Sequence, residues 1–243
     1  MRARNIAIVV PRYGPEINGG AESLARSYAL RLSTHADVTV LTTCALDYRT
    51  WRDHFPEGES RDGDVRVLRF PVPTPRDEGA FDALSHEVFG QSASRALEAA
   101  WMDAQGPVSP ELEAHLRDKG CDYDAVLFIP YLYATTARAL PIVAERSVLV
   151  GAFHDEPPLG LSIFDEVVDH AGAVVVSTPE ERQLASRRFG IGDDRLHVVG
   201  AGIDFSALSG GQREADFPGP VGGYVLSLGR IDASKGSTDL IGL

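Results

Sequence analysis

The residues Asn5-Ile-Ala-Ile-Val-Val10 form a continuous apolar run near the start of the chain. Such a run is typical of a strand that is buried on both faces of a parallel sheet. A loop rich in proline and glycine follows, and apolar residues then recur at helical spacing over residues 21–32. The next apolar stretch, residues 38–43, predicts a second strand. This order of strand, loop, helix and strand predicts a right-handed parallel crossover.

The same alternation continues along the chain. Apolar stretches predict strands at residues 65–70, 125–129, 147–153, 173–177 and 196–199, and helices at 81–104, 110–119 and 179–189, with a loop at 51–62. The last helix has the clearest start, because Thr178 is suited to cap it, Pro179 fits its first position and Glu181 completes a capping box. The pattern predicts an α/β fold: a Rossmann-like, open, mostly parallel sheet with helices on both faces.

The C-terminal part of the sequence predicts a change of domain. Residues 206–222 are rich in glycine, serine and proline and are predicted to be a linker. We therefore expect one domain over residues 1–205, and the first strand and the start of a helix of a second domain over residues 223–243. Arg230 and Lys235 flank the predicted strand-to-helix turn. Two cations at such a turn are suited to a diphosphate, and the alternative is two solvated loop charges.

Composition limits the class of partner. With 243 residues and 44% hydrophobic content, the chain is long enough to bury a sizeable core. Its net charge of −12 argues against nucleic acid and against an anionic membrane surface, since both require a basic patch. A peripheral membrane contact is left open, but nothing in the sequence indicates one. Two cysteines and an N-terminus without a leader make a reducing cytoplasm the expected compartment.

In open parallel sheets, ligands bind at the carboxyl ends of the strands. After the first predicted strand, Gly19-Gly20 stand at the start of a helix, where glycine lets a ligand approach free backbone N–H groups. A plain turn is the alternative. The sequence G-x-G-x-x-G is absent there, which argues against a dinucleotide cofactor. Arg12 and Tyr13 in the same loop are suited to face a substrate.

His154 and Asp155 follow the fifth predicted strand. A histidine beside a carboxylate at a strand's carboxyl end is suited to hydrogen-bond a substrate hydroxyl or to move a proton. The alternative is a histidine that pairs with Asp155 at the surface. No residues have the spacing of metal ligands, so no metal and no other cofactor is predicted.

These pieces, taken in order, resemble the GT-B glycosyltransferases, and in particular the large retaining family called GT4. The similarity extends over nearly the whole chain and rests on five motifs: Gly19-Gly20-Ala21-Glu22, His154-Asp155, the helix opening Ser177 to Leu184, the turn Val198 to Asp204, and Gly229-Arg230 with Lys235-Gly236. In the fourth motif Ala201 stands where the family has asparagine. The family's pair of glutamates in the second domain would fall beyond Leu243.

The resemblance implies a role for each matched residue. Gly19 and Gly20 would supply backbone N–H groups to the donor phosphate, and Arg230 and Lys235 would hold the diphosphate. His154, with Asp155 beside it, would hydrogen-bond the transferred sugar at the catalytic centre. The partners implied are a nucleotide-diphosphate sugar and a small-molecule or saccharide acceptor. The residues expected near the acceptor are Arg12, Tyr13, Glu22 and Tyr131, together with Trp51 and Tyr133.

The resemblance thus implies a cytoplasmic retaining hexosyltransferase, of which this chain is the acceptor-side half with the beginning of the donor-binding domain. We expect these 243 residues by themselves not to transfer sugar efficiently. Two alternatives stay open. One is a binding module that kept the fold and lost the reaction, and the other is a nucleotide-sugar epimerase on the same plan.

Overall fold

The computed structural model of this chain describes residues 4–90, 93–202 and 237–241. Within them, one eight-stranded sheet has the order β3-β4-β2-β1-β5-β6-β7-β8. Neighbouring strands run parallel, except for the antiparallel pair β3–β4. The strands are β1 (Arg4–Val9), β2 (Ala36–Thr43), β3 (Gly58–Asp62), β4 (Val65–Phe70), β5 (Ala125–Phe128), β6 (Ser147–Val150), β7 (Ala173–Val176) and β8 (Leu196–Val198). The predicted class, an open and mostly parallel α/β sheet, is confirmed.

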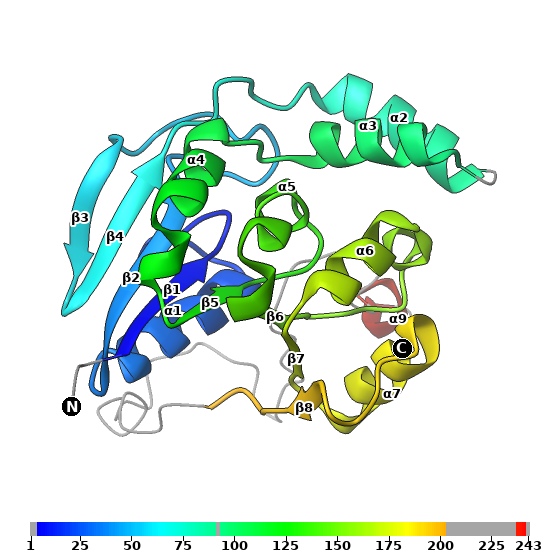
Figure 1. Cartoon of the computed structure of the whole chain (residues 1–243). Coiled ribbons are helices and arrows are strands. Elements are labelled where there is room, and N and C mark those ends of the chain that lie inside the picture. Colours follow the sequence, from blue (N-terminus) through cyan, green and yellow to red (C-terminus); the bar gives the residue numbers. More distant parts are fainter. Residues whose placement is uncertain (1–3, 91–92, 203–236, 242–243) are drawn as a thin grey trace, which may run out of the picture. The chain divides into compact units, whose positions relative to one another are not determined.

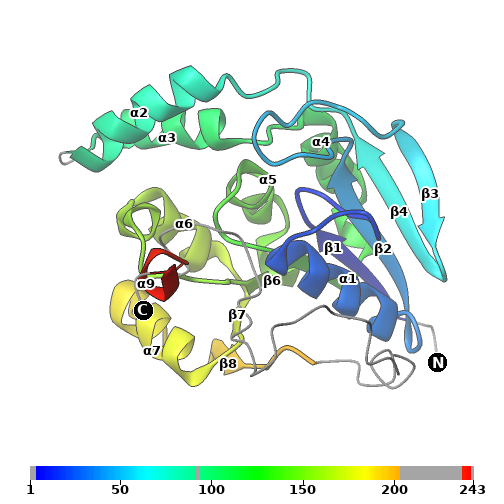
Figure 2. The same cartoon turned by 180° about the vertical axis from the view of Figure 1, so that it is seen from behind.

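Helices pack on both faces of this sheet. They are α1 (Gly20–Leu32), α2 (Glu78–Gly90), α3 (Arg95–Gln105), α4 (Pro110–Lys119), α5 (Ala134–Ala137), α6 (Ile163–His170) and α7 (Pro179–Phe189), with 3-10 turns η1 (Gly120–Asp122), η2 (Leu140–Arg146) and η3 (Pro157–Gly160). Figure 1 looks onto α4, α5 and α6, and Figure 2, from behind, looks onto α1. The chain therefore has the predicted three layers.

Strand β1 contributes to the core on both sides of the sheet. Ala7 and Val9 belong to a cluster that includes buried residues of α3, α4, α6 and α7. Ile8 belongs to a second cluster, which α1 covers through Ala25 and Ala29. Successive side chains of a strand point to opposite faces, so a strand covered on both sides has no polar side. This burial explains the unbroken apolar run at the start of the sequence.

The helix predicted at residues 81–104 is wrong as a single element, because the structure has two helices there. Helix α2 ends at Gly90 and α3 begins after Ser94. The Ser94 hydroxyl accepts a hydrogen bond from the backbone N–H of Leu97 at 3.2 Å, which is the bond of an N-terminal cap. The two helices pack side by side in both views (Figures 1 and 2).

The loop predicted at residues 51–62 is also partly wrong, because it contains the edge strand β3. Asp62 pairs with Val65 across a two-residue turn at Gly63, where φ is +60°. The two loop residues are Gly63 and Asp64, and a glycine at the first loop position is typical of a two-residue hairpin. The side chains of β3 are polar and mostly exposed, so the strand has no hydrophobic pattern by which it could be predicted.

Other elements were not predicted or are shorter than predicted. The predicted helices left out α5 and α6, and the strand expected over residues 147–153 ends at Val150. Ala152 has φ of 52°, which is incompatible with an extended strand. Strand β4 has the predicted bounds, and the remaining described strands that were predicted differ by one or two residues at their ends.

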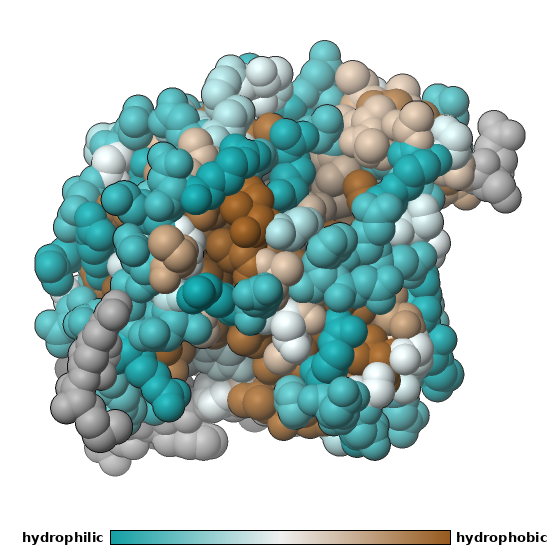
Figure 3. Space-filling model, viewed as in Figure 1, coloured by the Kyte–Doolittle hydropathy of each residue, from teal (hydrophilic) through white to brown (hydrophobic). Residues whose placement is uncertain are grey.

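Chain contacts divide the molecule into two compact units, Met1–Gly202 and Ile203–Leu243. In the second unit the described residues form the short helix α9 (Ser237–Ile241). The predicted linker and the predicted strand that follows it lie outside the described residues. Among those described, no helix is both long enough and apolar enough to cross a bilayer. The face in Figure 3 is mostly hydrophilic, and its apolar areas are separated by polar ones.

Candidate functional site

Four neighbouring loops leave the sheet at its carboxyl edge, and three of them carry most of the predicted site residues that the structure describes. They follow β1, β5, β6 and β7, which are neighbours in the sheet. These strands are parallel to one another. Parallel neighbours end at the same edge, so the four loops lie together where ligands of open α/β sheets bind.

The loop after β1 ends in the Gly19-Gly20 turn at the start of α1. No side chain of the described residues caps the first turn of this helix. Arg12 and Glu22 form a largely buried ion pair, with 7% and 9% of their side chains exposed, and Arg12 also donates to the carbonyl oxygen of Leu46 at 2.9 Å. A Cβ added to Gly20 would meet no atom within 4 Å, so this residue faces open space. The turn therefore presents free backbone N–H groups to a ligand.

Tyr13 lies in the core beneath the same loop. It is 1% exposed, and its hydroxyl donates to Oδ2 of Asp62 at 3.1 Å. Arg26 binds the same carboxylate at 2.7 and 3.0 Å. Burial raises the pKa of the Tyr13 phenol, and the charge of Asp62 raises it further. In this structure Tyr13 attaches the loop after β1 to the edge strand β3.

Tyr131 joins the loop after β5 to the loop after β6. It is 1% exposed, and its hydroxyl donates to Oε1 of Glu156 at 3.2 Å. Its ring lies 5.0 Å from that of Phe153 and 4.7 Å from that of Phe164. Burial raises the pKa of the Tyr131 phenol, as does the charge of Glu156. Glu156 was not predicted as a site residue. The sequence feature that could have indicated it is its position two residues after His154.

His154 and Asp155 are exposed at the end of the loop after β6. Neither side chain has a hydrogen bond or an ion pair within the described part of the chain, so the surface pairing considered as an alternative does not form there. Ala152, two residues before the histidine, has φ of 52°. A non-glycine residue in the left-handed region costs about 1–3 kcal/mol, and such strain is concentrated at functional sites. The two predicted catalytic side chains are thus free to meet a ligand.

Tyr133 is half-buried in the loop after β5, and its ring packs edge-on against that of Trp51 at 5.3 Å. Burial raises the pKa of its phenol, the charges of Glu22 and Glu156 raise it as well, and those of Arg12 and Arg76 lower it. Glu22 lies in α1 and Arg12 in the loop before it, whereas Arg76 follows β4 and Glu156 follows β6. The loop predicted to bind phosphate and the loop predicted to be catalytic follow β1 and β6, which flank β5 in the sheet.

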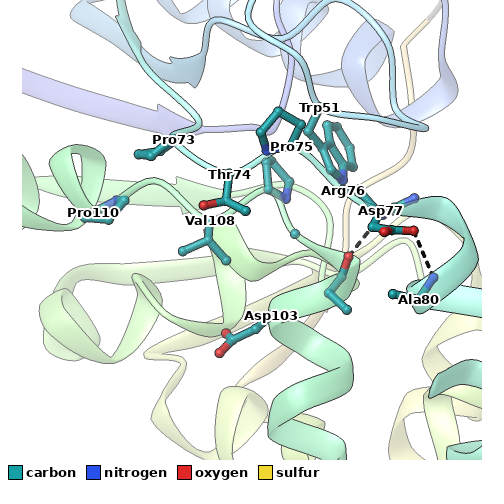
Figure 4. A pocket seen from close by; sticks show the side chains of 13 residues that line it. Trp51, Pro73, Thr74, Pro75, Arg76, Asp77, Ala80, Asp103, Val108 and Pro110 are labelled. Atoms are coloured by element: carbon teal, nitrogen blue, oxygen red, sulfur yellow. Dashed lines mark hydrogen bonds between the residues drawn. The ribbon is translucent and has the colours of Figure 1, made fainter.

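A pocket of about 380 Å³ lies beside Trp51 (Figure 4), whose ring is 5.3 Å from that of Tyr133. Its walls are mostly apolar, with a few polar side chains, as is usual for small-molecule sites. The lining residues are Trp51, Pro73, Thr74, Pro75, Arg76, Asp77, Ala80, Asp103, Ala104, Gly106, Pro107, Val108 and Pro110. Of the residues predicted near an acceptor, Trp51 lines this pocket, and Arg12, Tyr13, Glu22, Tyr131 and Tyr133 do not.

Arg76 holds one wall of the pocket in place. Its guanidinium lies 5.2 Å from the ring of Trp51 and 4.4 Å from that of Phe81. It donates to the carbonyl oxygens of Tyr48 and Ala104 at 3.2 Å each, and to Gln105 through both the backbone and the side-chain oxygen. Burial lowers the pKa of Arg76. The charge lies against the last carbonyl groups of α3, which carry the negative end of the helix dipole.

Two predicted phosphate ligands, Arg230 and Lys235, lie outside the described residues. Within the described part of the chain, no group of three histidine, cysteine or acidic side chains is placed to hold a metal ion.

Comparisons with known proteins give similarity in structure. No protein-family model matches the sequence, and no curated protein matches it. The fold is similar to a structure described as "Trehalose-6-phosphate from E. coli bound with UDP-2-fluoro glucose", with a TM-score of 0.48, 15% identity, and coverage of 85% of this chain and 50% of that one. It is also similar to an alpha,alpha-trehalose 6-phosphate synthase from Burkholderia multivorans, with a TM-score of 0.48, 13% identity, and coverage of 86% and 51%.

A third similar structure is OtsA in its apo form, with a TM-score of 0.45, 13% identity, and coverage of 90% of this chain and 53% of that one. The chain thus spans about half the length of each of these solved structures.

Proposed function

We propose that this chain is the acceptor-side domain of a GT-B glycosyltransferase of the retaining, GT4-like type. In this proposal the enzyme transfers a hexose from a nucleotide-diphosphate sugar to a small-molecule or saccharide acceptor in the cytoplasm. The observation that supports it most is that the Gly19-Gly20 loop, the Tyr131 loop and the His154 loop follow the neighbouring parallel strands β1, β5 and β6 at the carboxyl edge of the sheet. The five sequence motifs, which occur in the family's order, are the second support.

Each predicted site residue has a role in this reaction. The backbone N–H groups of Gly19 and Gly20 bind the donor phosphate, and Arg230 and Lys235 neutralise the diphosphate as it leaves. His154 hydrogen-bonds the sugar that is transferred, and Asp155 adjoins it. The bond between the anomeric carbon and the diphosphate oxygen breaks, and an acceptor hydroxyl oxygen bonds to that carbon on the same face. The hydroxyl proton passes to the leaving diphosphate.

The pocket lined by Trp51 is the proposed acceptor pocket. Its apolar walls offer flat surfaces to the C–H face of a sugar ring, and Thr74 and Asp103 offer polar atoms to hydroxyl groups. Its volume of about 380 Å³ is in the range of small-molecule sites.

The test is sugar transfer by the full-length protein, followed by mass spectrometry with a panel of nucleotide-diphosphate sugars and acceptors. We expect transfer by the wild type and a loss of about a hundredfold or more in the Arg230→Ala and Lys235→Ala variants. Unchanged turnover in both variants would remove the diphosphate role. Acceptor binding without transfer under any condition would favour the binding module, and a changed donor sugar without acceptor would favour the epimerase.

A further inference from the structure

One carboxylate joins the ends of two neighbouring strands at the candidate site. Oε1 of Glu181 accepts the backbone N–H of Phe153 at 2.8 Å, and Oε2 accepts that of Ser177 at 2.7 Å. Phe153 belongs to the loop after β6, and Ser177 is the first residue after β7. Hydrogen bonds to a charged acceptor are roughly twice as strong as neutral ones, so this bridge is a firm link between the two loops.

Glu181 lies in the first turn of α7, whose cap involves the backbone of Glu181 and not its carboxylate. The hydroxyl of Thr178 accepts the backbone N–H of Glu181 at 3.1 Å, which caps the helix as predicted. The predicted second half of the capping box is wrong, because the Glu181 carboxylate binds Ser177 and Phe153 instead of the N–H of Thr178. Within the described residues, no basic side chain pairs with Glu181. The hydroxyl of Tyr28 on α1 is buried without a partner among the described residues; burial raises the pKa of this phenol, and the charge of Glu181 raises it further.

Phe153 is fixed from its side chain as well as from its backbone. It is 3% exposed, and its ring lies 5.0 Å from Tyr131 and 5.4 Å from Phe189. The residue before it, Ala152, has φ of 52° and turns the chain away from the strand. The bond from Phe153 to Glu181 therefore holds a strained backbone segment, and His154 is the next residue.

We propose that Glu181 is a positioning residue for His154, which acts by clamping the backbone one residue before the histidine. The inference rests on the proposed function, in which His154 contacts the transferred sugar. A single N–H bond at Phe153 fixes the direction in which the chain enters His154. Since misplacement of a reacting group by about 1 Å costs about a hundredfold in rate, loss of the clamp lowers turnover more than binding.

The kinetic experiment compares Glu181→Gln with Thr178→Ala in the full-length protein. The amide has one neutral oxygen in place of two charged ones, so one of the two N–H groups loses its partner and the other keeps a weaker bond. We expect a fall of about a hundredfold in kcat with the acceptor KM within about threefold. Thr178→Ala removes the cap of the same helix and leaves the carboxylate bridge, so its kcat should stay within about twofold of the wild type. Equal losses of kcat in both variants would mean that Glu181 stabilises the start of α7 and does not position His154.

An NMR experiment detects the hydrogen bond between Phe153 and Glu181 without measuring activity. Labelling with [1-¹³C]alanine and [¹⁵N]phenylalanine selects Ala-Phe pairs, and this sequence has two of them, Ala80-Phe81 and Ala152-Phe153. We expect Glu181→Gln to shift the amide proton resonance of Phe153 upfield. The amide resonance of Phe81, whose partner is the carbonyl oxygen of Asp77, should stay unchanged. If Glu181→Gln is unfolded, Glu181→Asp, which reaches one N–H group, takes its place. An unmoved Phe153 signal would overturn the inference.

A third variant, His154→Ala, separates this inference from the proposed function. If His154→Ala turns over normally, the proposed role of His154 is wrong and Glu181 has nothing to position. If His154→Ala is inactive and Glu181→Gln turns over normally, the positioning inference alone is wrong. If both are impaired, the double variant should be no slower than His154→Ala, because a clamp has no effect once its histidine is gone.

Discussion

Glu22 of α1 forms a buried ion pair with Arg12 directly against Gly19, so that a Cβ at Gly19 would overlap the Glu22 carboxylate. Gly19 has φ of 176°, which any residue can adopt, so contact alone requires glycine here. We expect Gly19→Ala to lower the free energy of unfolding by about 1–3 kcal/mol, as overpacking does. Denaturant unfolding measures this free energy. A Gly19→Ala variant as stable as the wild type would show that the ion pair can move away from the added Cβ.

Gly20→Ala should separate binding from stability. A Cβ there meets nothing within 4 Å, and alanine favours a helix by about 1 kcal/mol over glycine. We therefore expect unchanged or greater stability. If a donor phosphate approaches this N–H, the methyl group should raise the donor KM about tenfold or more. A donor KM equal to that of the wild type would place the phosphate elsewhere.

Arg76 should be a major stabilising residue of the pocket wall. Hydrogen bonds to charged groups contribute about 1.5–3 kcal/mol each, and Arg76 also stacks between two rings. We expect Arg76→Ala to cost about 2–4 kcal/mol and Arg76→Lys to recover less than half of this, because a lysine lacks the planar fork. The exposed Arg52 provides the control, since Arg52→Ala should be within about 0.5 kcal/mol of the wild type in urea unfolding.

Asp62 should make stability depend on pH in the acid range. Hydrogen bonds from Arg26 hold the pKa of its carboxyl below the ordinary value of 3.8, and the bond from Tyr13 lowers it further. A lowered pKa in the folded state gives stabilisation that is complete above the ordinary pKa and is lost as the pH falls through the lowered one. Asp62→Asn should thus cost about 1 kcal/mol at neutral pH. In urea unfolding this difference should shrink below pH 3.8; a constant difference would mean that the charge contributes nothing.

A larger side chain at an exposed position of α2 should narrow the pocket. Ala80 of α2 lines it, whereas Ala83 is exposed on the same helix and does not. We expect Ala80→Leu to raise the acceptor KM about tenfold or more, because filling a pocket by a few methylene groups has effects of this size. Ala83→Leu should leave it unchanged. Equal acceptor KM values in the two variants would locate the acceptor outside this pocket.

The sequence predicted the parts of the fold that depend on local pattern. The apolar run ending at Val10 and the helix start at Thr178 carry strong local signals, and both elements form as expected. The edge strand β3 was missed because a polar strand is defined by its partner β4 and not by its own pattern. The same limit applies to the site. His154 was predicted from its position after a strand, but the carboxylate of Glu181 reaches across to Phe153, and no sequence pattern records that contact.

The most direct test of the central claim is the kcat of sugar transfer by the full-length protein, with and without His154. We predict that the wild type transfers sugar from a nucleotide-diphosphate donor. His154→Ala should lower kcat at least about a hundredfold with an unchanged melting temperature, while His86→Ala, which alters another exposed histidine, should have no effect. Turnover by His154→Ala equal to that of the wild type would contradict a catalytic site at this edge of the sheet.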